Sequence, residues 1–245
     1  MGEILEFAAK GTTAARDKLI VALDVPTVQE AEALVDKIGE TVSFYKVGLE
    51  LVMNGGMASV TALKDQGKRV FLDVKFLDID TTVEKATANA ARSGADFLTV
   101  HATDSKTLRA AARGAADSQL QVLGVTVLTS LNGDDLTEQG ISSEPADLVV
   151  HRAKLAHAAG CHGVIASGQE AAGIRQAIPD RNFAIVTPGI RLPSDDVGDQ
   201  ARVTTPDSAI GAGATHIVVG RPITQAPDPK AAAKLFVDRI SGANA

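Results

Sequence analysis

The segment Phe71-Leu-Asp-Val-Lys-Phe-Leu-Asp78 carries three ionisable side chains at a spacing suited to acid–base chemistry. In an extended strand, side chains two residues apart point to the same side, so Asp73 and Lys75 would be neighbours. Asp78 follows where the predicted strand gives way to a loop. An isolated Asp-x-Lys pair could simply be an internal ion pair that fixes the strand, so the charged residues elsewhere decide between this interpretation and catalysis.

Two further charged residues end other apolar runs of the sequence. Asp24 follows the run Leu19–Leu23, and Lys46 lies near the end of Val42–Val47. Lysines and aspartates withdrawn from water together are costly unless they pair with one another, so such a cluster usually serves chemistry. Surrounding carboxylates would keep the lysines protonated, as a cationic proton donor requires. The sequence therefore favours an electrostatic catalytic site.

Eight short, β-branched apolar runs are predicted to form the strands that position these residues. They are Leu19–Leu23, Val42–Val47, Arg69–Val74, Phe97–Val100, Val122–Leu128, Gly163–Ala166, Phe183–Val186 and His216–Val219. The stretches between them have helical spacing, such as Val28 to Ile38. Alternating strands and helices require a parallel sheet, because parallel neighbours need helical crossovers. Eight units in 245 residues fit a (β/α)8 TIM barrel, an α/β fold, better than an open doubly wound sheet.

The chain, residues 1–245, is predicted to be one domain, since no linker or composition shift interrupts it. Ile4 to Arg16 is expected to add a short N-terminal helix that closes the bottom of the barrel. Helix starts are indicated by three possible capping boxes and one Asp-Pro pair: Thr27 with Glu30, Thr81 with Glu84, Ser167 with Glu170, and Asp228-Pro229. Glycines before the next strand indicate helix ends: Gly39, Gly67, Gly94, Gly160 and Gly213.

In a barrel of this type the active site lies at the carboxyl ends of the strands. Beyond the charged residues already named, the polar candidates there are His101, Thr129, Arg191, Gly220 and Arg221. The eighth strand end is a common phosphate site, where Gly220 would let backbone N–H groups approach an anion and Arg221 would supply a two-pronged donor.

Three other features carry less weight as evidence for a catalytic site. The loop from about Arg191 to Thr205 is long for such a barrel and resembles a lid, from which Gln200 could reach a phosphate. His101 is more simply a packed or supporting histidine. Cys161-His162 looks like a nucleophile and base, but it precedes the sixth strand on the opposite end of the barrel, so a structural role is expected.

Composition narrows the class of protein. The 24 basic and 30 acidic residues give a net charge of −6, and aromatic residues make up 3%, which argues against nucleic-acid binding. No apolar run approaches a membrane span and no signal segment is evident, so a cytoplasmic location is expected. One cysteine excludes a disulfide framework, and no His/Cys cluster has the spacing of a zinc site.

The chain resembles the orotidine 5′-phosphate decarboxylase family along almost its whole length. The matching segments are Val21-Ala-Leu-Asp24, Tyr45-Lys-Val-Gly48, Asp73-Val-Lys-Phe-Leu-Asp78 with Thr82, Val127-Leu-Thr-Ser130, Val186-Thr-Pro-Gly-Ile-Arg191, Gly198-Asp-Gln200 and Val219-Gly-Arg-Pro222. The Asp-x-Lys-x-x-Asp core is shared with related barrels, whereas the full order of segments is specific. The chain has Leu77-Asp-Ile-Asp-Thr-Thr82 where many relatives have His-Asp-Ile-Pro-Asn-Thr.

The resemblance implies decarboxylation of orotidine 5′-monophosphate to UMP and CO2, the last step of de novo UMP synthesis, without metal or organic cofactor. It implies a charged catalytic network of Lys46, Asp73, Lys75 and Asp78, in which Lys75 donates the proton to C6. It also implies a homodimer whose partner subunit supplies Asp78 and Thr82 to each site. The implied substrate contacts are Asp24 and Lys46 to the ribose, Thr129 to the pyrimidine, and Gln200, Gly220 and Arg221 to the phosphate, with Arg191 nearby.

Two alternatives stay open. One is a metal-dependent phosphosugar decarboxylase or aldolase of the related barrels, which would carry a metal-binding carboxylate near the position of Lys46. The other is a non-catalytic barrel that binds pyrimidine nucleotides.

Overall fold

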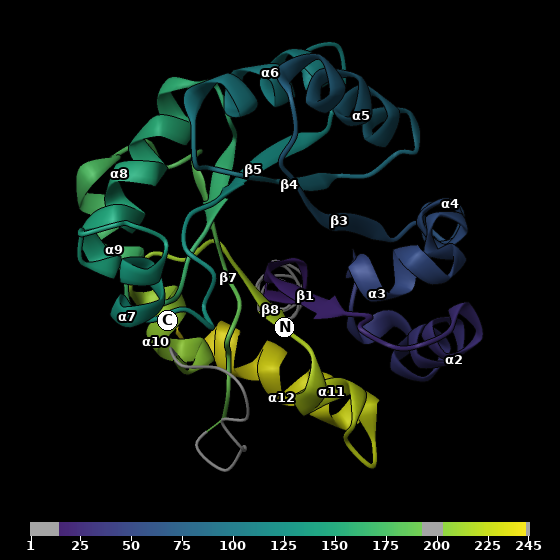
Figure 1. Cartoon of the computed structure of the whole chain (residues 1–245). Helices are drawn as coiled ribbons and strands as arrows, with labels where there is room; N and C mark the ends of the chain where they lie inside the picture. Colours follow the sequence, from purple (N-terminus) through teal and green to yellow (C-terminus); the bar gives the residue numbers. More distant parts are fainter. Residues whose placement is uncertain (1–14, 193–202, 244–245) are drawn as a thin grey trace.

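Eight parallel strands form a closed barrel in sequence order, and β1 pairs with β8 to close it (Figure 1). The computed structural model describes residues 15–192 and 203–243. The strands are β1 (Leu19–Ala22), β2 (Phe44–Gly48), β3 (Arg69–Phe76), β4 (Phe97–His101), β5 (Gln121–Val125), β6 (Gly163–Ile165), β7 (Ala184–Thr187) and β8 (His216–Val219). The predicted single (β/α)8 barrel is confirmed.

Helices surround the barrel and connect its strands (Figure 1). They are α2 (Val28–Ile38), α3 (Leu49–Leu51), α4 (Met57–Asp65), α5 (Asp80–Arg92), α6 (Ser105–Ala115), α7 (Gly133–Glu138), α8 (Pro145–Ala158), α9 (Ala171–Ala177), α10 (Pro206–Gly211), α11 (Arg221–Thr224) and α12 (Pro229–Gly242), with short turns η1 (Gly39–Thr41) and η2 (Val52–Gly56). Of the predicted N-terminal helix, Ala15 and Arg16 are described, in a helical turn that runs to residue 18, and the remainder lies outside the described residues.

The core has two layers because strand side chains alternate between the barrel interior and the surrounding helices. In β1, Leu19 and Val21 pack outward among the helices, whereas Ile20 and Ala22 belong to the interior cluster. The interior cluster consists of Ile20, Ala22, Phe44, Phe71, Phe97, Leu123, Ala184, Val186 and Val218. This packed interior supports the residues at the carboxyl ends of the strands.

Helix α2 starts as the sequence predicts, and so does α12. The hydroxyl oxygen of Thr27 accepts a hydrogen bond from the Glu30 N–H, and the Asp228 carboxylate accepts one from Ala231. The five glycines predicted at helix ends all have positive φ, which a residue without Cβ adopts readily: Gly39, Gly67, Gly94, Gly160 and Gly213.

Two predicted helix starts are wrong. Helix α5 begins at Asp80, so Thr81 lies inside its first turn, and Ile79 precedes it without a side-chain cap. Helix α9 begins at Ala171, and the Ser167 hydroxyl accepts a hydrogen bond from Gln169 in the preceding turn instead. The Ser/Thr-to-Glu spacing therefore marks neither start, since Thr81 already lies within α5 and the Ser167 hydroxyl bonds within the turn before α9.

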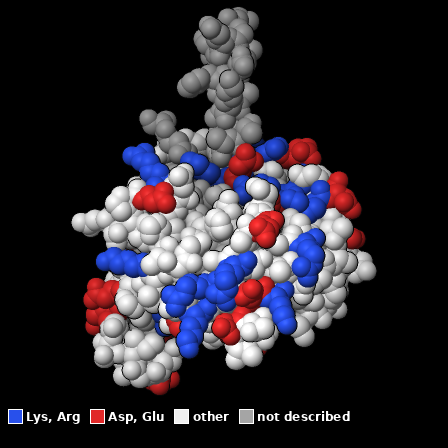
Figure 2. Space-filling view, turned by 90° about the horizontal axis from the view of Figure 1, so that it is seen from above, with Lys and Arg blue, Asp and Glu red and all other residues white. Residues whose placement is uncertain are grey.

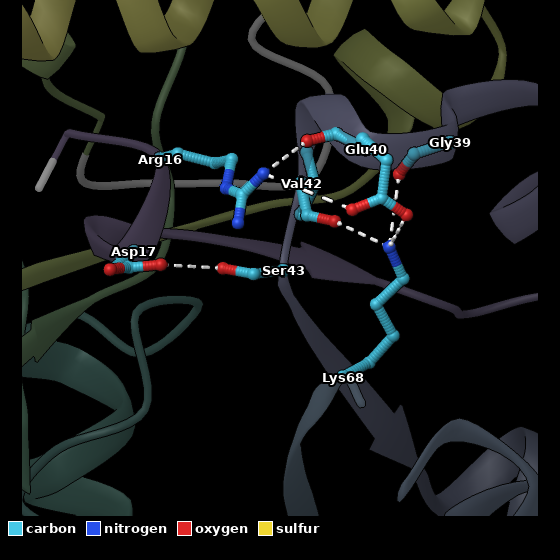
Figure 3. Close-up of polar contacts among 7 residues, drawn as sticks. All are labelled: Arg16, Asp17, Gly39, Glu40, Val42, Ser43 and Lys68. Atoms are coloured by element: carbon cyan, nitrogen blue, oxygen red, sulfur yellow. Dashed lines mark hydrogen bonds and ion pairs between the residues drawn. The ribbon is translucent and has the colours of Figure 1, made fainter. Parts of the chain in front are cut away.

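A polar cluster ties together three segments at the amino ends of the strands (Figure 3). The Lys68 ammonium donates to the carbonyls of Gly39 and Val42, at 3.2 and 3.4 Å, and to a Glu40 carboxylate oxygen at 3.0 Å. The Arg16 guanidinium donates to the Glu40 carbonyl at 2.7 Å. This cluster lies at the start of β3, away from the strand ends where the candidate site is expected, so we assign it a structural role.

The outer face of α5 and α6 carries Lys and Arg interspersed with Asp and Glu (Figure 2). Arg113 of α6 pairs with Glu84 of α5 at 2.8 Å, so opposite charges neutralise each other across these helices. In the described ranges, no helix is long and apolar enough to cross a membrane.

Candidate active site

A cavity of about 630 Å3 opens at the carboxyl ends of the strands, where the sequence predicts the active site. Its volume lies within the range of small-ligand pockets, roughly 300–1,000 Å3. The predicted site residues that line it are Asp24, Lys46, Asp73, Lys75, Thr129, Arg191, Gly220 and Arg221. Its apolar wall includes Phe71, Val125, Ile165 and Val218, which the sequence identified only as core strand residues.

Four charged side chains form an alternating row along one side of the cavity. The Lys46 ammonium lies 2.8 Å from Asp24 Oδ1 and 3.3 Å from Asp73 Oδ2. The Lys75 ammonium lies 2.8 Å from the other oxygen of Asp73, Oδ1. Each of the two central charges therefore has an opposite charge on both sides, which compensates for its removal from water.

The centre of this row is the most buried part. The side chains of Lys46 and Asp73 are 10% and 11% exposed, against 29% for Lys75 and 49% for Asp24. Burial by itself would lower the pKa of Lys46, but the charges of Asp73 and Asp24 outweigh it and hold that pKa above its usual value. The Lys46 ammonium therefore stays charged at neutral pH.

The Asp73 carboxylate is held ionised in the same way. Burial would raise its pKa, but the charges of Lys46 and Lys75 and hydrogen bonds from Lys75 and Thr99 lower the pKa below its usual value. The site can thus present a fixed carboxylate and a fixed ammonium side by side, both largely buried, where electrostatic interactions are stronger than in water.

The register of the barrel brings these residues together. Ala22 pairs with Lys46, and Gly48 pairs with Asp73, so the ends of β1, β2 and β3 meet at one edge. A Cβ on Gly48 would lie 2.7 Å from Asp24 Oδ1 and 2.9 Å from Lys46 Nζ. Glycine at this position therefore leaves the space in which the Asp24–Lys46 ion pair forms.

The remaining cavity residues lie on the side of β5, β7 and β8. Gly220 and Arg221 follow β8 directly, and Arg221 opens the short helix α11. Arg191 is buried, and its guanidinium donates to the Ile190 carbonyl at 2.9 Å. Thr129 lies in the turn after β5. This side of the cavity therefore carries two arginines, Arg191 and Arg221, whereas Gln200 lies outside the described residues.

Two predicted site residues do not line the cavity of their own chain. Asp78 is exposed after β3, where its carboxylate accepts a hydrogen bond from the Ile79 N–H. Thr82 is exposed in the first turn of α5. Their neighbours Leu77 and Ile79 are also exposed, at 56% and 71%. The structure thus separates Asp78 and Thr82 from the cavity residues within one chain.

Other candidates from the sequence lie elsewhere or serve packing. Burial raises the pKa of the Cys161 thiol to about 12, so the thiolate that a nucleophile requires is disfavoured. His162 Nδ1 accepts a hydrogen bond from the Val122 N–H, which joins it to the start of β5. Within the described residues, no group of three or more His, Cys, Asp or Glu side chains is placed to hold a metal ion.

One polar contact of the site was missed at the level of sequence. Thr99 of β4 is fully buried, and its hydroxyl donates to Asp73 Oδ1 at 2.8 Å. Thr99 lies within the apolar run Phe97–Val100 and is itself β-branched, so the sequence does not distinguish it from an ordinary strand residue. No spacing in the sequence links it to Asp73, 26 positions away. The contact arises only from the pairing of β3 with β4.

A family model described as "Orotidine 5'-phosphate decarboxylase / HUMPS family" matches residues 17–236. Among solved structures, the chain is similar to orotidine 5′-phosphate decarboxylase from Lactobacillus acidophilus, with 37% identity, a TM-score of 0.81, and coverage of 91% of this chain and 99% of that one. It is also similar to an uncharacterized conserved protein from Geobacillus kaustophilus, with 35% identity, a TM-score of 0.78 and the same coverage.

Proposed function

The chain belongs to the orotidine 5′-phosphate decarboxylase / HUMPS family, and from this we propose that it converts orotidine 5′-monophosphate into UMP and CO2. The observation that carries the proposal is the alternating row Asp24–Lys46–Asp73–Lys75, with its two ammonium groups and two carboxylates within 3.3 Å of their neighbours. A pair of fixed opposite charges next to a cavity suits a reaction that creates negative charge on carbon.

Lys75 is the proposed proton donor. When the bond between C6 and the substrate carboxylate breaks, the electron pair stays on C6 and CO2 leaves as a neutral molecule. A fixed ammonium directed at C6 stabilises this carbanion and then transfers a proton to it, which forms the C6–H bond of UMP. Lys75 regains its proton from solvent, to which its side chain is 29% exposed.

Asp73 and Lys46 are proposed to shape the charge around the reacting carbon. The Asp73 carboxylate would face the substrate carboxylate, and loss of neutral CO2 relieves the repulsion between the two anions. Lys46 holds Asp73 from the other side, at 3.3 Å, and with Asp24 would contact the ribose. Thr129 would contact the pyrimidine.

The phosphate is proposed to bind to Gly220, Arg221 and Gln200, with Arg191 nearby. Binding energy from a remote phosphate can lower the barrier of the chemical step when it orders the catalytic groups. Arg221 lines the same cavity as the charged row, which is consistent with one substrate that spans both sides.

A homodimer is part of the proposal, and Asp78 and Thr82 would enter the site of the partner subunit. In support, exposed apolar side chains lie on the segments that follow β2 and β3: Leu49, Met53 and Met57 after β2, and Leu77 and Ile79 on either side of Asp78 after β3, with Met53 84% exposed. Exposed apolar groups gathered beside a site are typical of a protein interface.

The cytoplasmic location expected from the sequence stays a prediction.

The metal-dependent phosphosugar reaction of related barrels is the rival within this family. Lys46 argues against it, because its ammonium lies between the carboxylates of Asp24 and Asp73, where that reaction would require a metal-binding carboxylate. An ammonium cannot coordinate a cation.

The ultraviolet absorbance of orotidine 5′-monophosphate, followed with purified protein and excess chelator, tests the proposal. Loss of the orotate band with formation of UMP supports it, and the matched Lys75→Ala protein should leave the band unchanged. An unchanged band with folded wild-type protein contradicts it. Turnover of a phosphosugar with added Mg2+ would then identify the rival enzyme, and UMP binding without any turnover would identify a nucleotide-binding protein.

A further inference from the structure

The pairing of β3 with β4 is interrupted at the candidate proton donor. Leu72 pairs with Leu98, but the next pair joins Phe76 to Val100, so four steps along β3 correspond to two along β4. Lys75 lies in this bulge with φ +49°, the one positive φ among the described residues other than glycine. Bulges of this kind redirect a side chain at the expense of regular ladder hydrogen bonds.

Thr99 supplies a hydrogen-bond acceptor for the Lys75 backbone where the ladder is interrupted. Its hydroxyl oxygen accepts from the Lys75 N–H at 3.0 Å, so this buried backbone donor is satisfied although the ladder is shifted. The same hydroxyl donates to Asp73 Oδ1 at 2.8 Å. Thr99 has no exposed surface, so water does not compete for either contact.

These contacts close a ring through one carboxylate oxygen. Asp73 Oδ1 accepts from the Thr99 hydroxyl and from the Lys75 ammonium, both at 2.8 Å, while Thr99 also holds the Lys75 backbone. One hydroxyl thus fixes the backbone of the lysine and the carboxylate that orients its ammonium. Because Thr99 is β-branched, it has few χ1 rotamers and keeps this orientation firmly.

We propose that Thr99 is a positioning residue that holds Lys75 in its left-handed backbone conformation and directs its ammonium into the cavity. Thr99 does not line the cavity, so its effect passes through Lys75 and Asp73. The inference rests on the proposed function for its kinetic consequence, but the geometry it describes can be tested independently of any substrate.

The kinetic test compares Thr99→Val, Thr99→Ser and Thr87→Val. Valine keeps the shape of threonine but removes the hydroxyl, so kcat should fall about 10- to 100-fold, the effect of leaving buried partners unpaired, with KM within about threefold. Serine restores the hydroxyl and should recover most of kcat. Thr87, on α5, is an equally buried threonine whose hydroxyl has no hydrogen-bond partner in the described part of the chain, and its valine variant should keep wild-type kcat.

A wild-type kcat in folded Thr99→Val would overturn the proposal, and so would a Thr99→Ser protein as impaired as Thr99→Val. If Thr99→Val does not fold, the kcat of Thr99→Ala is compared with that of Thr99→Ser instead. Both variants lack the methyl group of threonine, and only the serine has a hydroxyl.

Crystal structures separate this inference from the proposed function. In Thr99→Val, we expect Lys75 to leave its positive φ or its ammonium to move beyond hydrogen-bond distance of Asp73 Oδ1. An unchanged Lys75 would refute the positioning role whatever the reaction. If the wild-type protein does not decarboxylate orotidine 5′-monophosphate, the proposed function fails, while the crystallographic comparison still decides the role of Thr99.

Discussion

The ammonium of Lys75 lies 2.8 Å from Oδ1 of Asp73, although the two residues belong to a part of β3 that is not a regular strand. Simple alternation predicts them on one side of the strand. The structure reaches the same contact through a bulge and a positive φ at Lys75. The contact between the two side chains therefore depends on the local backbone conformation of β3 as well as on their spacing in the sequence.

Replacement of Lys75 by alanine should reduce decarboxylation at least about 10³-fold, because proton transfer and stabilisation of the carbanion are lost together. UMP should still bind, since the other cavity residues remain. Turnover by absorbance and UMP affinity by calorimetry measure the two effects. Lys37→Ala, an exposed change on α2, is the control, and substantial activity in Lys75→Ala would refute the assignment of the proton donor.

Arg221→Ala should lower both affinity and turnover. Loss of a charge-assisted contact to phosphate should reduce kcat/KM about 10- to 100-fold. Part of this loss should appear in kcat, because phosphate binding energy contributes to the chemical step. Steady-state kinetics at saturating substrate provide the measurement. Arg239→Ala removes an arginine of α12 that pairs with Asp207 and should have no effect; an unchanged kcat in Arg221→Ala would contradict the coupling.

Gly48→Ala should damage the site and leave the fold intact. The added Cβ would lie 2.7 Å from Asp24 Oδ1 and 2.9 Å from Lys46 Nζ, which are the free ends of side chains and can move apart. We therefore expect kcat/KM to fall about tenfold or more through loss of this charged pair, with a melting temperature close to that of the wild type. Gly173→Ala on α9, where the nearest atom to the new Cβ is 3.7 Å away, is the control. Full activity in Gly48→Ala would show that the Asp24–Lys46 pair is dispensable.

Mixing of two inactive variants tests whether sites are shared between subunits. Lys75→Ala and Asp78→Ala each remove one component, and a heterodimer would keep one complete site if Asp78 acts in the partner's site. Random exchange between the two proteins makes half of the dimers mixed, so about a quarter of the wild-type activity should return. Mass spectrometry verifies the exchange. No recovery despite verified heterodimers would place Asp78 outside the shared site.

The partly buried histidine at the amino end of β8, His216, should make stability pH-dependent. Burial, reinforced by the charges of Arg69 and Lys18, lowers the pKa of His216 from 6.5 to about 3. Between these values the unfolded chain binds a proton that the folded chain does not, so stability falls as pH decreases below 6.5. By pH 5 the loss should be about 2 kcal/mol.

Urea unfolding between pH 7 and 5 measures this loss. His216→Phe should flatten the dependence, because phenylalanine does not titrate and can keep edge contacts such as that with Phe97, whose ring centroid lies 5.2 Å away. A smaller slope should remain, since burial also lowers the pKa of His162. His151→Gln, an exposed change on α8, is the control. An equally steep loss of stability in His216→Phe would assign the effect to other groups.

Several features of the site follow from the sequence because they depend on local order along the chain. The carboxyl ends of parallel strands all face the same edge, so Asp24, Lys46, Asp73 and Lys75 could be placed at one cavity without knowledge of their distances. The glycines at helix ends were predicted for the same reason, because a positive φ is a local requirement.

Other features depend on contacts between distant segments. The capping patterns at Thr81 and Ser167 did not mark the helix starts, because α5 begins one residue earlier, at Asp80, and α9 begins at Ala171, after the turn that contains Ser167. Thr99 looked like one more β-branched strand residue until the register of β3 against β4 placed its hydroxyl between Asp73 and Lys75. The sequence by itself determined which charged groups meet, because the order of the strands and their common direction bring the residues at their carboxyl ends to one edge of the barrel. The tertiary structure alone decided how they are held, because a hydrogen bond between residues far apart in the chain depends on register to within a fraction of a residue.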